Sequence, residues 1–287
     1  MKFDKIYILT CNRVDNQITY NQLSDNLKSK VVLVVQAWER PQYKLDCEYL
    51  VLPESIHYTD SRAVAKTRQV IYNHAKNLRY AILDDDLRFK RRNSKYWTGV
   101  SNMDTSAKIC DPSEVDEMFV LFDTWLDDPN IAFCSCSQTN NPPGSTPFRD
   151  NASISSAYWI DGPKILDIVE NTDFSVLSVS EDVYFILKLL NNGRQNRIST
   201  EFAVDNRSYN LLSMNSTLWD NITSDIVTQD HIFLAKEFPG IYEILYDVNS
   251  KIRSGGYRDT GKTRIHWNKA FKMWEKKQQG ALNDFFS

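Results

Sequence analysis

Three consecutive acids, Asp84, Asp85 and Asp86, have the strongest potential for chemistry in this chain. They follow the apolar run 80–83, which is typical of a buried strand, and ligands of open α/β sheets bind outside the carboxyl ends of strands. Adjacent carboxylates repel each other unless a cation neutralises them, and Mg²⁺ and Mn²⁺ prefer oxygen ligands. Strand alternation places Asp84 and Asp86 on one side and Asp85 on the other. The alternative is a solvated turn balanced by the basic segment 88–92, but the strand leading into the acids favours a metal site.

Alternating strands and helices are expected to position these acids. Apolar runs predict strands at residues 6–10, 31–35, 49–52 and 80–83, and helical periodicity predicts helices at 20–27 and 61–78. Such alternation predicts an α/β fold with a mainly parallel central sheet and right-handed crossovers.

The second half of the chain has a less regular pattern. It predicts helices at 115–126, 163–170, 181–190 and 267–277, strands at 131–136 and 157–160, and loops at 140–147 and 251–264. No repeat or linker divides the chain, so we expect one domain over 1–287. Residues 1–92 would form its nucleotide-sugar-binding half, and 93–287 its acceptor half with the C-terminal loop and helix.

Composition limits the classes of function. A net charge of −3 gives no overall attraction to nucleic acid, so any DNA contact must come from local basic patches. Five cysteines without paired spacing argue against a zinc site and favour reduced thiols. No apolar stretch is long enough to cross a bilayer and the N-terminus does not resemble a signal peptide, so we expect a cytoplasmic protein.

A helix bearing Arg68 ahead of the acid-tipped strand resembles the layout of GT-A nucleotide-sugar transferases. More narrowly, the chain resembles the glycosyltransferases associated with base-hydroxylating dioxygenases (the TET/JBP-associated family), which include phage DNA-base transferases. The matching residues are Ile8–Arg13, Val34-Val35 with Glu39 and Tyr43, Val51–Pro53, Thr67–Gln69 and Ile82–Leu87, and more loosely Ser180–Asp182, Gly255-Gly256 and Arg264–Trp267. The segment Tyr58–Ser61 replaces the small or Gly-rich residues that usually precede the Arg-bearing helix.

The resemblance implies roles for residues at the ends of the first strands and on the helix. Thr10, Asn12 and Arg13 would lie beside the nucleotide base and phosphates, and Glu39 would contact base or ribose. Arg68 would contact the nucleotide or its diphosphate. For Arg13 and Glu39, an ordinary surface charge is the alternative.

The resemblance also implies a metal site. Asp86 would hold Mn²⁺ or Mg²⁺ directly, Asp84 would face ribose or metal, and Asp85 would turn towards the donor sugar or the protein. His266 is a candidate third ligand, with a structural histidine as the alternative. Arg258, in the basic loop, would close over the pyrophosphate, unless the loop is simply solvated.

In inverting enzymes of the GT-A fold, an acid at a helix start can serve as general base. Here Asp182, beside Glu181, would take the proton from the acceptor hydroxyl. The alternative is a helix start with Ser180 as N-cap and two acids complementing the helix dipole.

The resemblance implies transfer of glucose or arabinose from a UDP-sugar to a 5-hydroxymethylpyrimidine in phage DNA, above all 5-hydroxymethylcytosine, in the cytoplasm of an infected bacterium. The segment 88–92 with Tyr96 and Trp97 would contact DNA, unless it only balances acids, and Tyr158, Trp159 and the loop at 140–147 would line the acceptor pocket. The alternatives are a GT-A enzyme with a glycan acceptor, an inactive binding module, and a metal-dependent nuclease or polymerase.

Overall fold

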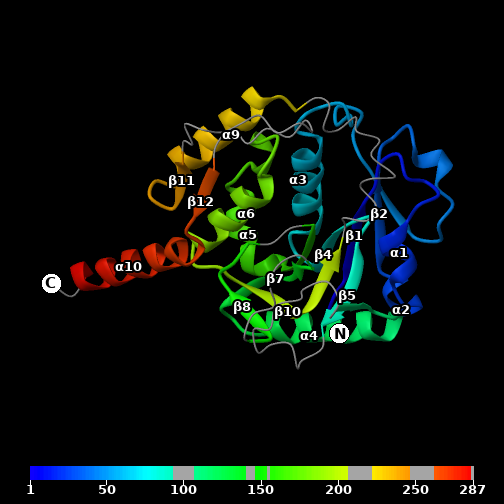
Figure 1. Ribbon diagram of the computed structural model, residues 1–287, viewed down its shortest axis with the longest axis horizontal. Coiled ribbons are helices and arrows are strands. Elements are labelled where there is room, and N and C mark those ends of the chain that lie inside the picture. The colour runs from blue at the N-terminus through cyan, green and yellow to red at the C-terminus, as the bar shows by residue number, and fades with distance from the viewer. Residues whose placement is uncertain (93–106, 140–145, 154–155, 206–221, 246–261, 286–287) are drawn as a thin grey trace.

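The computed structural model describes residues 1–287 except 93–106, 140–145, 154–155, 206–221, 246–261 and 286–287. Within the described residues, ten strands form one central sheet (Figure 1). They are β1 (Lys5–Leu9), β2 (Val31–Val35), β3 (Glu48–Val51), β4 (Arg79–Asp84), β5 (Arg88–Arg92), β6 (Ala107–Ile109), β7 (Ile131–Gln138), β8 (Phe148–Asp150), β9 (Ala157–Asp161) and β10 (Gln195–Asp205). Their spatial order is β3-β2-β1-β4-β9-β7-β10-β5-β6, with β8 paired to β10. The predicted α/β fold with a large central sheet is confirmed.

Strands β3, β2, β1 and β4 are parallel, so the carboxyl ends of β1 and β4 lie side by side. Leu9 is opposite Asp84 in their register. The chain runs outward from β1 to β2 and β3, then crosses through helix α3 (Ala63–Ala75) to β4 on the other side of β1. A reversal of this kind opens a crevice outside the ends of the two central strands, where ligands bind in open α/β sheets.

The rest of the sheet combines both strand directions. β9 pairs antiparallel with β4 and with β7, while β10 runs parallel to β7 and antiparallel to β5. The basic segment after the acids, for which the sequence analysis predicts no element, is strand β5, which lies beside β10 and not beside β4.

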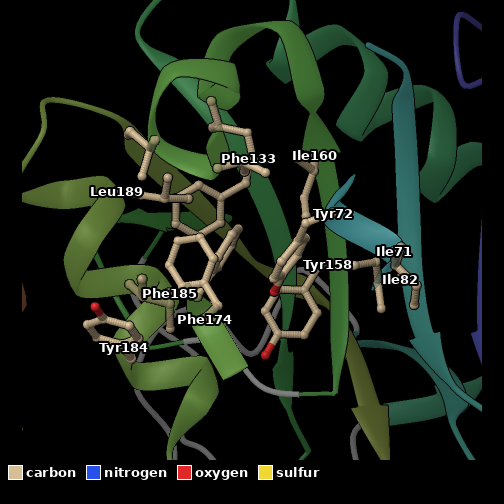
Figure 2. Packing of buried hydrophobic residues seen from close by; sticks show 14 of the residues in the cluster. Ile71, Tyr72, Ile82, Phe133, Tyr158, Ile160, Phe174, Tyr184, Phe185 and Leu189 are labelled. Atoms are coloured by element: carbon tan, nitrogen blue, oxygen red, sulfur yellow. The ribbon is translucent and has the colours of Figure 1, made fainter. Parts of the chain in front are cut away.

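Helices cover both faces of the sheet, and each face has its own apolar cluster. α3, α5 (Gly162–Glu170) and α6 (Glu181–Leu190) pack on one face, and α2 (Asp25–Lys28) and α4 (Pro112–Leu126) on the other. Phe185 of α6 stacks on Tyr72 of α3 with ring centroids 4.7 Å apart, and it also contacts Phe133 and Tyr158 of the sheet (Figure 2). This packing fixes α3 and α6 relative to each other.

The described C-terminal part contains helix α9 (Ser224–Glu237), the antiparallel pair β11 (Tyr242–Leu245) and β12 (Lys262–Ile265), and helix α10 (Trp267–Phe285). Gly193, just after α6, has a φ of +76° and faces Trp274 of α10. A Cβ atom at Gly193 would lie 2.4 Å from the indole ring, so glycine is what lets α10 dock there.

The helix predicted at 20–27 is instead two short helices, α1 (Ile18–Gln22) and α2. The single-helix prediction is wrong because Leu23 is extended and the Ser24 hydroxyl accepts a hydrogen bond from the Leu27 amide, which starts a new helix. The described residues also contain two 3₁₀ helices, η1 (Arg40–Gln42) and η3 (Phe174–Val176). All five cysteines are free thiols, and among the described residues no helix is long and apolar enough to cross a membrane.

Candidate active site

The acid triplet lies in a turn at the end of β4, and Thr19 of α1 holds this turn in place. The Thr19 hydroxyl donates to the Asp84 carbonyl (2.6 Å) and accepts from the Leu87 amide (2.9 Å). The Thr19 amide donates to the Asp85 carbonyl (3.0 Å). Thr19 is fully buried, so these bonds tie the turn firmly to α1. No sequence motif marks Thr19, because its partners lie more than 60 residues away.

Arg13, four residues beyond β1, is the counter-charge of two of the acids. Its guanidinium lies 2.5 Å from the Asp85 carboxylate and 3.0 Å from that of Asp86. The expectation that Asp86 groups with Asp84 against Asp85 is therefore wrong for these contacts. Strand alternation ends with β4 at Asp84, and the next two acids share one cation in the turn.

Arg68 connects the triplet to helix α6. Its guanidinium contacts the Glu181 carboxylate (2.5 Å) and donates to the Tyr158 hydroxyl (3.2 Å), and it lies 3.5 Å from the Asp84 carboxylate. The Arg68 side chain is only 7% exposed. The structure thus brings together the predicted arginine and the predicted acids from the ends of β4 and α6.

The start of α6 is held by Asp230 of α9. The Asp230 carboxylate accepts hydrogen bonds from the amides of Ser178 (2.9 Å) and Val179 (2.6 Å). Ser180 is left-handed, with a φ of +64°, and its side chain makes no capping bond, so the predicted N-cap is wrong. The Asp182 carboxylate instead accepts from the next amide of the helix (2.7 Å). The sequence offered no signal for Asp230, which lies about 50 residues away from its partners.

Burial raises the pKa values of the triplet. The pKa of Asp84 rises to about 6, because burial and the nearby Asp86 outweigh the opposing charge of Arg68. The pKa of Asp85 rises to about 7, where burial outweighs Arg13. The Oδ2 atom of Asp85 is buried without a hydrogen-bond partner among the described residues. The positive charges of Arg13 and Arg68 therefore neutralise these two carboxylates only in part.

Glu181 and Asp182 add to this excess of negative charge. Burial raises the pKa values of both, with Arg68 opposing the rise. Within the described residues, Glu181 is ion-paired with Arg68, and Asp182 has no ion pair. We call the triplet and these two residues the acid cluster. Five carboxylates face two guanidiniums there, so a further cation would stabilise it.

Thr10, Asn12 and Glu39 lie just beyond the ends of β1 and β2. The Asn12 amide, at a residue with a φ of +57°, donates to the Glu39 carboxylate (2.5 Å). The Thr10 hydroxyl bonds to the Tyr43 hydroxyl (3.1 Å) and accepts from the Gln17 amide group (2.8 Å). Glu39 is 1% exposed, and burial raises its pKa. The surface-charge alternative for Glu39 is therefore wrong, because the residue is a buried acid that braces the loop after β1.

Of the other predicted ligands, the described one is His266, and its contact is to Glu243 and not to the acid cluster. The His266 Nε2 atom lies 3.1 Å from the carboxylate of Glu243 on β11. No three His, Cys, Asp or Glu side chains of the described residues are grouped so as to hold a metal ion. Arg258 lies outside the described residues.

The basic segment 88–92 uses much of its charge inside the protein. Lys90 pairs with Asp205 at 2.7 Å, and Arg92, which is 2% exposed, donates to groups of β7 and β10. These contacts lie within the sheet, so for Lys90 and Arg92 the alternative in which the segment balances the triplet is wrong. The expected stacking residues at 96–97 lie outside the described part of the chain.

Trp159 does not line a pocket. It is fully buried and packs edge-on against Phe119 and Phe122 of α4. The expectation is wrong because Trp159 and its neighbour Tyr158 belong to strand β9, whose residues are all buried, and Tyr158 alone points to Arg68. The loop residues 140–145 lie outside the described residues.

Comparison with known proteins identifies one family. The model of a family described as TET-Associated Glycosyltransferase matches residues 4–214, well over half of the 287 residues. The matched stretch contains the whole acid cluster with Arg13 and Arg68, and it ends before α9. No curated protein matches the chain.

Proposed function

The chain belongs to the TET-associated glycosyltransferase family and is a glycosyltransferase, and we propose that it transfers a sugar from a UDP-sugar to a 5-hydroxymethylpyrimidine in DNA. The proposed acceptor is the hydroxymethyl group of 5-hydroxymethylcytosine, and the proposed sugar is glucose or arabinose. The proposed setting is the cytoplasm of a phage-infected bacterium.

The observation that carries this proposal is the position of the acid cluster between two arginines. The cluster lies where the strand order reverses, at the adjoining ends of β1 and β4. Arg13 contacts it from the β1 side and Arg68 from α3. A UDP leaving group carries a diphosphate, and guanidiniums bind phosphate oxygens well. The two arginines could therefore exchange a carboxylate partner for a phosphate when the donor binds.

We propose that the acid cluster binds a divalent cation, with Asp86 and Asp84 as its two protein ligands. Carboxylate oxygens are suitable donors for Mn²⁺ or Mg²⁺. The raised pKa values of Asp84 and Asp85 and the unpartnered oxygen of Asp85 support a need for more positive charge. A cation there would offset charge that develops on the departing diphosphate. We leave His266 out of this site because its contact is to Glu243.

We propose Asp182 as the general base and assign Glu181 to holding Arg68. The base would take the proton of the acceptor hydroxyl as that oxygen bonds to the anomeric carbon and UDP leaves, which inverts the configuration. Glu181 is engaged by Arg68 at 2.5 Å, whereas Asp182 has no ion pair among the described residues. Burial raises the pKa of Asp182, and a base is most effective when its pKa approaches the working pH.

The test is to incubate the protein with Mn²⁺, DNA containing 5-hydroxymethylcytosine, and either UDP-glucose or UDP-arabinose, then to weigh the nucleosides. A gain of one hexosyl or pentosyl group on the modified base supports the proposal. No gain with any UDP-sugar, together with UDP release on a glycan acceptor, would assign the enzyme to glycans instead.

The metal site has a test that does not depend on activity. A ligand that binds only the folded state raises Tm, so Mn²⁺ should raise the Tm of the wild-type protein. Asp86→Asn should lose this shift, whereas Asp46→Asn, an exposed acid before β3, should keep it. An equal shift in both variants would remove Asp86 from the proposed site.

A further inference from the structure

A cleft of about 890 Å³ lies between β8 and the start of α10, away from the acid cluster. In Figure 1 these two elements are neighbours at the lower left of the sheet. One wall comes from residues 146–152, and the other from residues 265–276. None of the five acids of the acid cluster lines it.

The α10 wall carries three lysines on one helix face. Lys269, Lys272 and Lys276 all line the cleft, and their spacing of three and four residues places them on the same side of the helix. The Lys269 ammonium donates to the Gly240 carbonyl (2.6 Å), which leaves its charge unneutralised. All three lysines are exposed. We call this cavity the lysine cleft.

The β8 wall adds a positive charge and unpartnered polar atoms. The Arg149 Nε and Asn151 Oδ1 atoms are buried without hydrogen-bond partners among the described residues, and Asn151 is 9% exposed. Among the described residues that line the cleft, Asp150 is the one acid, and Arg197 holds it through bonds of 2.8 and 3.0 Å. The described lining of the cleft therefore offers no free negative charge. It fits an anion that also offers N–H or O–H groups, as a nucleic acid strand does.

The lysine cleft is linked to the acid cluster through a short piece of chain. The Ser156 carbonyl accepts a hydrogen bond from the Asp84 amide (3.0 Å). From Asn151 to Ser156 the chain can span at most roughly 18 Å. Phosphates of one DNA strand follow each other every 3.4 Å or so along the duplex axis. The β8 wall thus lies within about five nucleotides of a base held at the acid cluster.

We propose that the lysine cleft binds backbone phosphates of the acceptor DNA that flank the modified base. The naming of DNA as the ligand rests on the proposed function. The cleft itself is argued from the unneutralised charges of α10 and β8, the unpartnered atoms, and the distance to Asp84. Lys272 and Lys276 would contact phosphates as point charges.

The test measures binding of labelled DNA without modified bases and without donor, as a single strand and as a duplex, over a series of salt concentrations. Replacing both Lys272 and Lys276 by Ala should weaken binding and reduce the slope of log affinity against log salt by about 1 for each lysine. Lys277→Ala, an exposed neighbour on α10 outside the cleft, is the matched control and should keep the wild-type slope. Alanine favours helix, so both proteins should keep their Tm.

The proposal is overturned if the double variant binds with wild-type affinity and slope, or if Lys277→Ala loses as much. The outcome is independent of the proposed reaction, because binding needs neither donor nor modified base. Transfer to the modified nucleoside with no effect of the lysine substitutions on binding would retain the reaction and refute the lysine cleft. DNA binding through the lysine cleft without any transfer would retain the lysine cleft and refute the proposed reaction.

Discussion

Replacing Arg68 by Met tests whether its guanidinium allows Glu181 and Asp84 to stay buried. Met keeps much of the side-chain volume and removes the charge, so the carboxylates at 2.5 and 3.5 Å lose their partner. Removing one member of a buried ion pair costs about 3–5 kcal/mol. For a chain of this length we expect Tm to fall by roughly 6–10 °C.

The loss should depend on pH in a direction set by these carboxyls. Folding raises the pKa of Asp84 to about 6, from an unfolded value of about 4. Such a group destabilises the folded protein most above its folded pKa, and the penalty disappears below its unfolded pKa, where the carboxyl is protonated in both states. Without Arg68 the pKa rises further, so the deficit against wild type should shrink between about pH 8 and about pH 5.

Thermal unfolding followed by circular dichroism at about pH 8 and about pH 5 measures the difference in Tm between Arg68→Met and wild type. Adding Glu181→Gln to Arg68→Met removes one unpaired charge and should recover part of the Tm. Arg264→Met is the control, because its ion pair with Glu243 spans 3.8 Å at the surface and should contribute less than about 1 kcal/mol. A Tm for Arg68→Met within about 2 °C of wild type, or an equal loss at both pH values, would refute the reasoning.

Three further substitutions test the acid cluster and its support. Asp182→Asn should lower kcat by about 10²–10⁴-fold in steady-state assays without lowering Tm, and an unchanged kcat would exclude it as base. Asp85→Asn should raise Tm at about pH 8 and lose this advantage towards about pH 4, because the ionised carboxyl opposes folding above its pKa of about 7; a Tm difference independent of pH contradicts this. Thr19→Val removes the hydroxyl that serves the Asp84 carbonyl and the Leu87 amide, so we expect a loss of about 1–3 kcal/mol in the free energy of unfolding and faster hydrogen exchange at Leu87. Unaltered exchange there would show that Thr19 does not hold the turn.

The parallel part of the fold was predictable because its strands are apolar throughout. β2 has the predicted bounds, 31–35, and all five of its residues are buried. β1, β4 and β7 differ from prediction by one or two residues at their ends. Helix α6 also has its predicted range, 181–190, because its apolar residues recur at helical spacing.

β5 and β10 were not predicted because remote partners neutralise their charged residues. Arg91 of β5 pairs with Glu201 of β10 at 2.7 Å, although the two are 110 residues apart. Arg197 of β10 pairs with Asp150 of β8 in the same way. A local window of sequence contains only one member of each pair, so these segments have the composition of loops.

The candidate site was predictable where its reactive residues come directly after a strand in the sequence. The triplet and Arg68 meet because α3 leads directly into β4. The pairing of each acid with its cation was not predictable, since Arg13 reaches Asp85 from the loop after the neighbouring strand β1 and the turn breaks the strand alternation. Thr19 was missed for a related reason: its role is visible only in three dimensions.

The excess of carboxylates in the acid cluster has a consequence for the effect of ionic strength. Without a divalent cation, an approaching diphosphate meets like charge, and salt screens that repulsion. Added salt should therefore speed donor association, while it weakens phosphate binding in the lysine cleft. Donor binding to the cation-free protein and DNA binding in the lysine cleft would therefore respond to salt in opposite directions, and adding Mn²⁺ should remove the salt response of the donor alone.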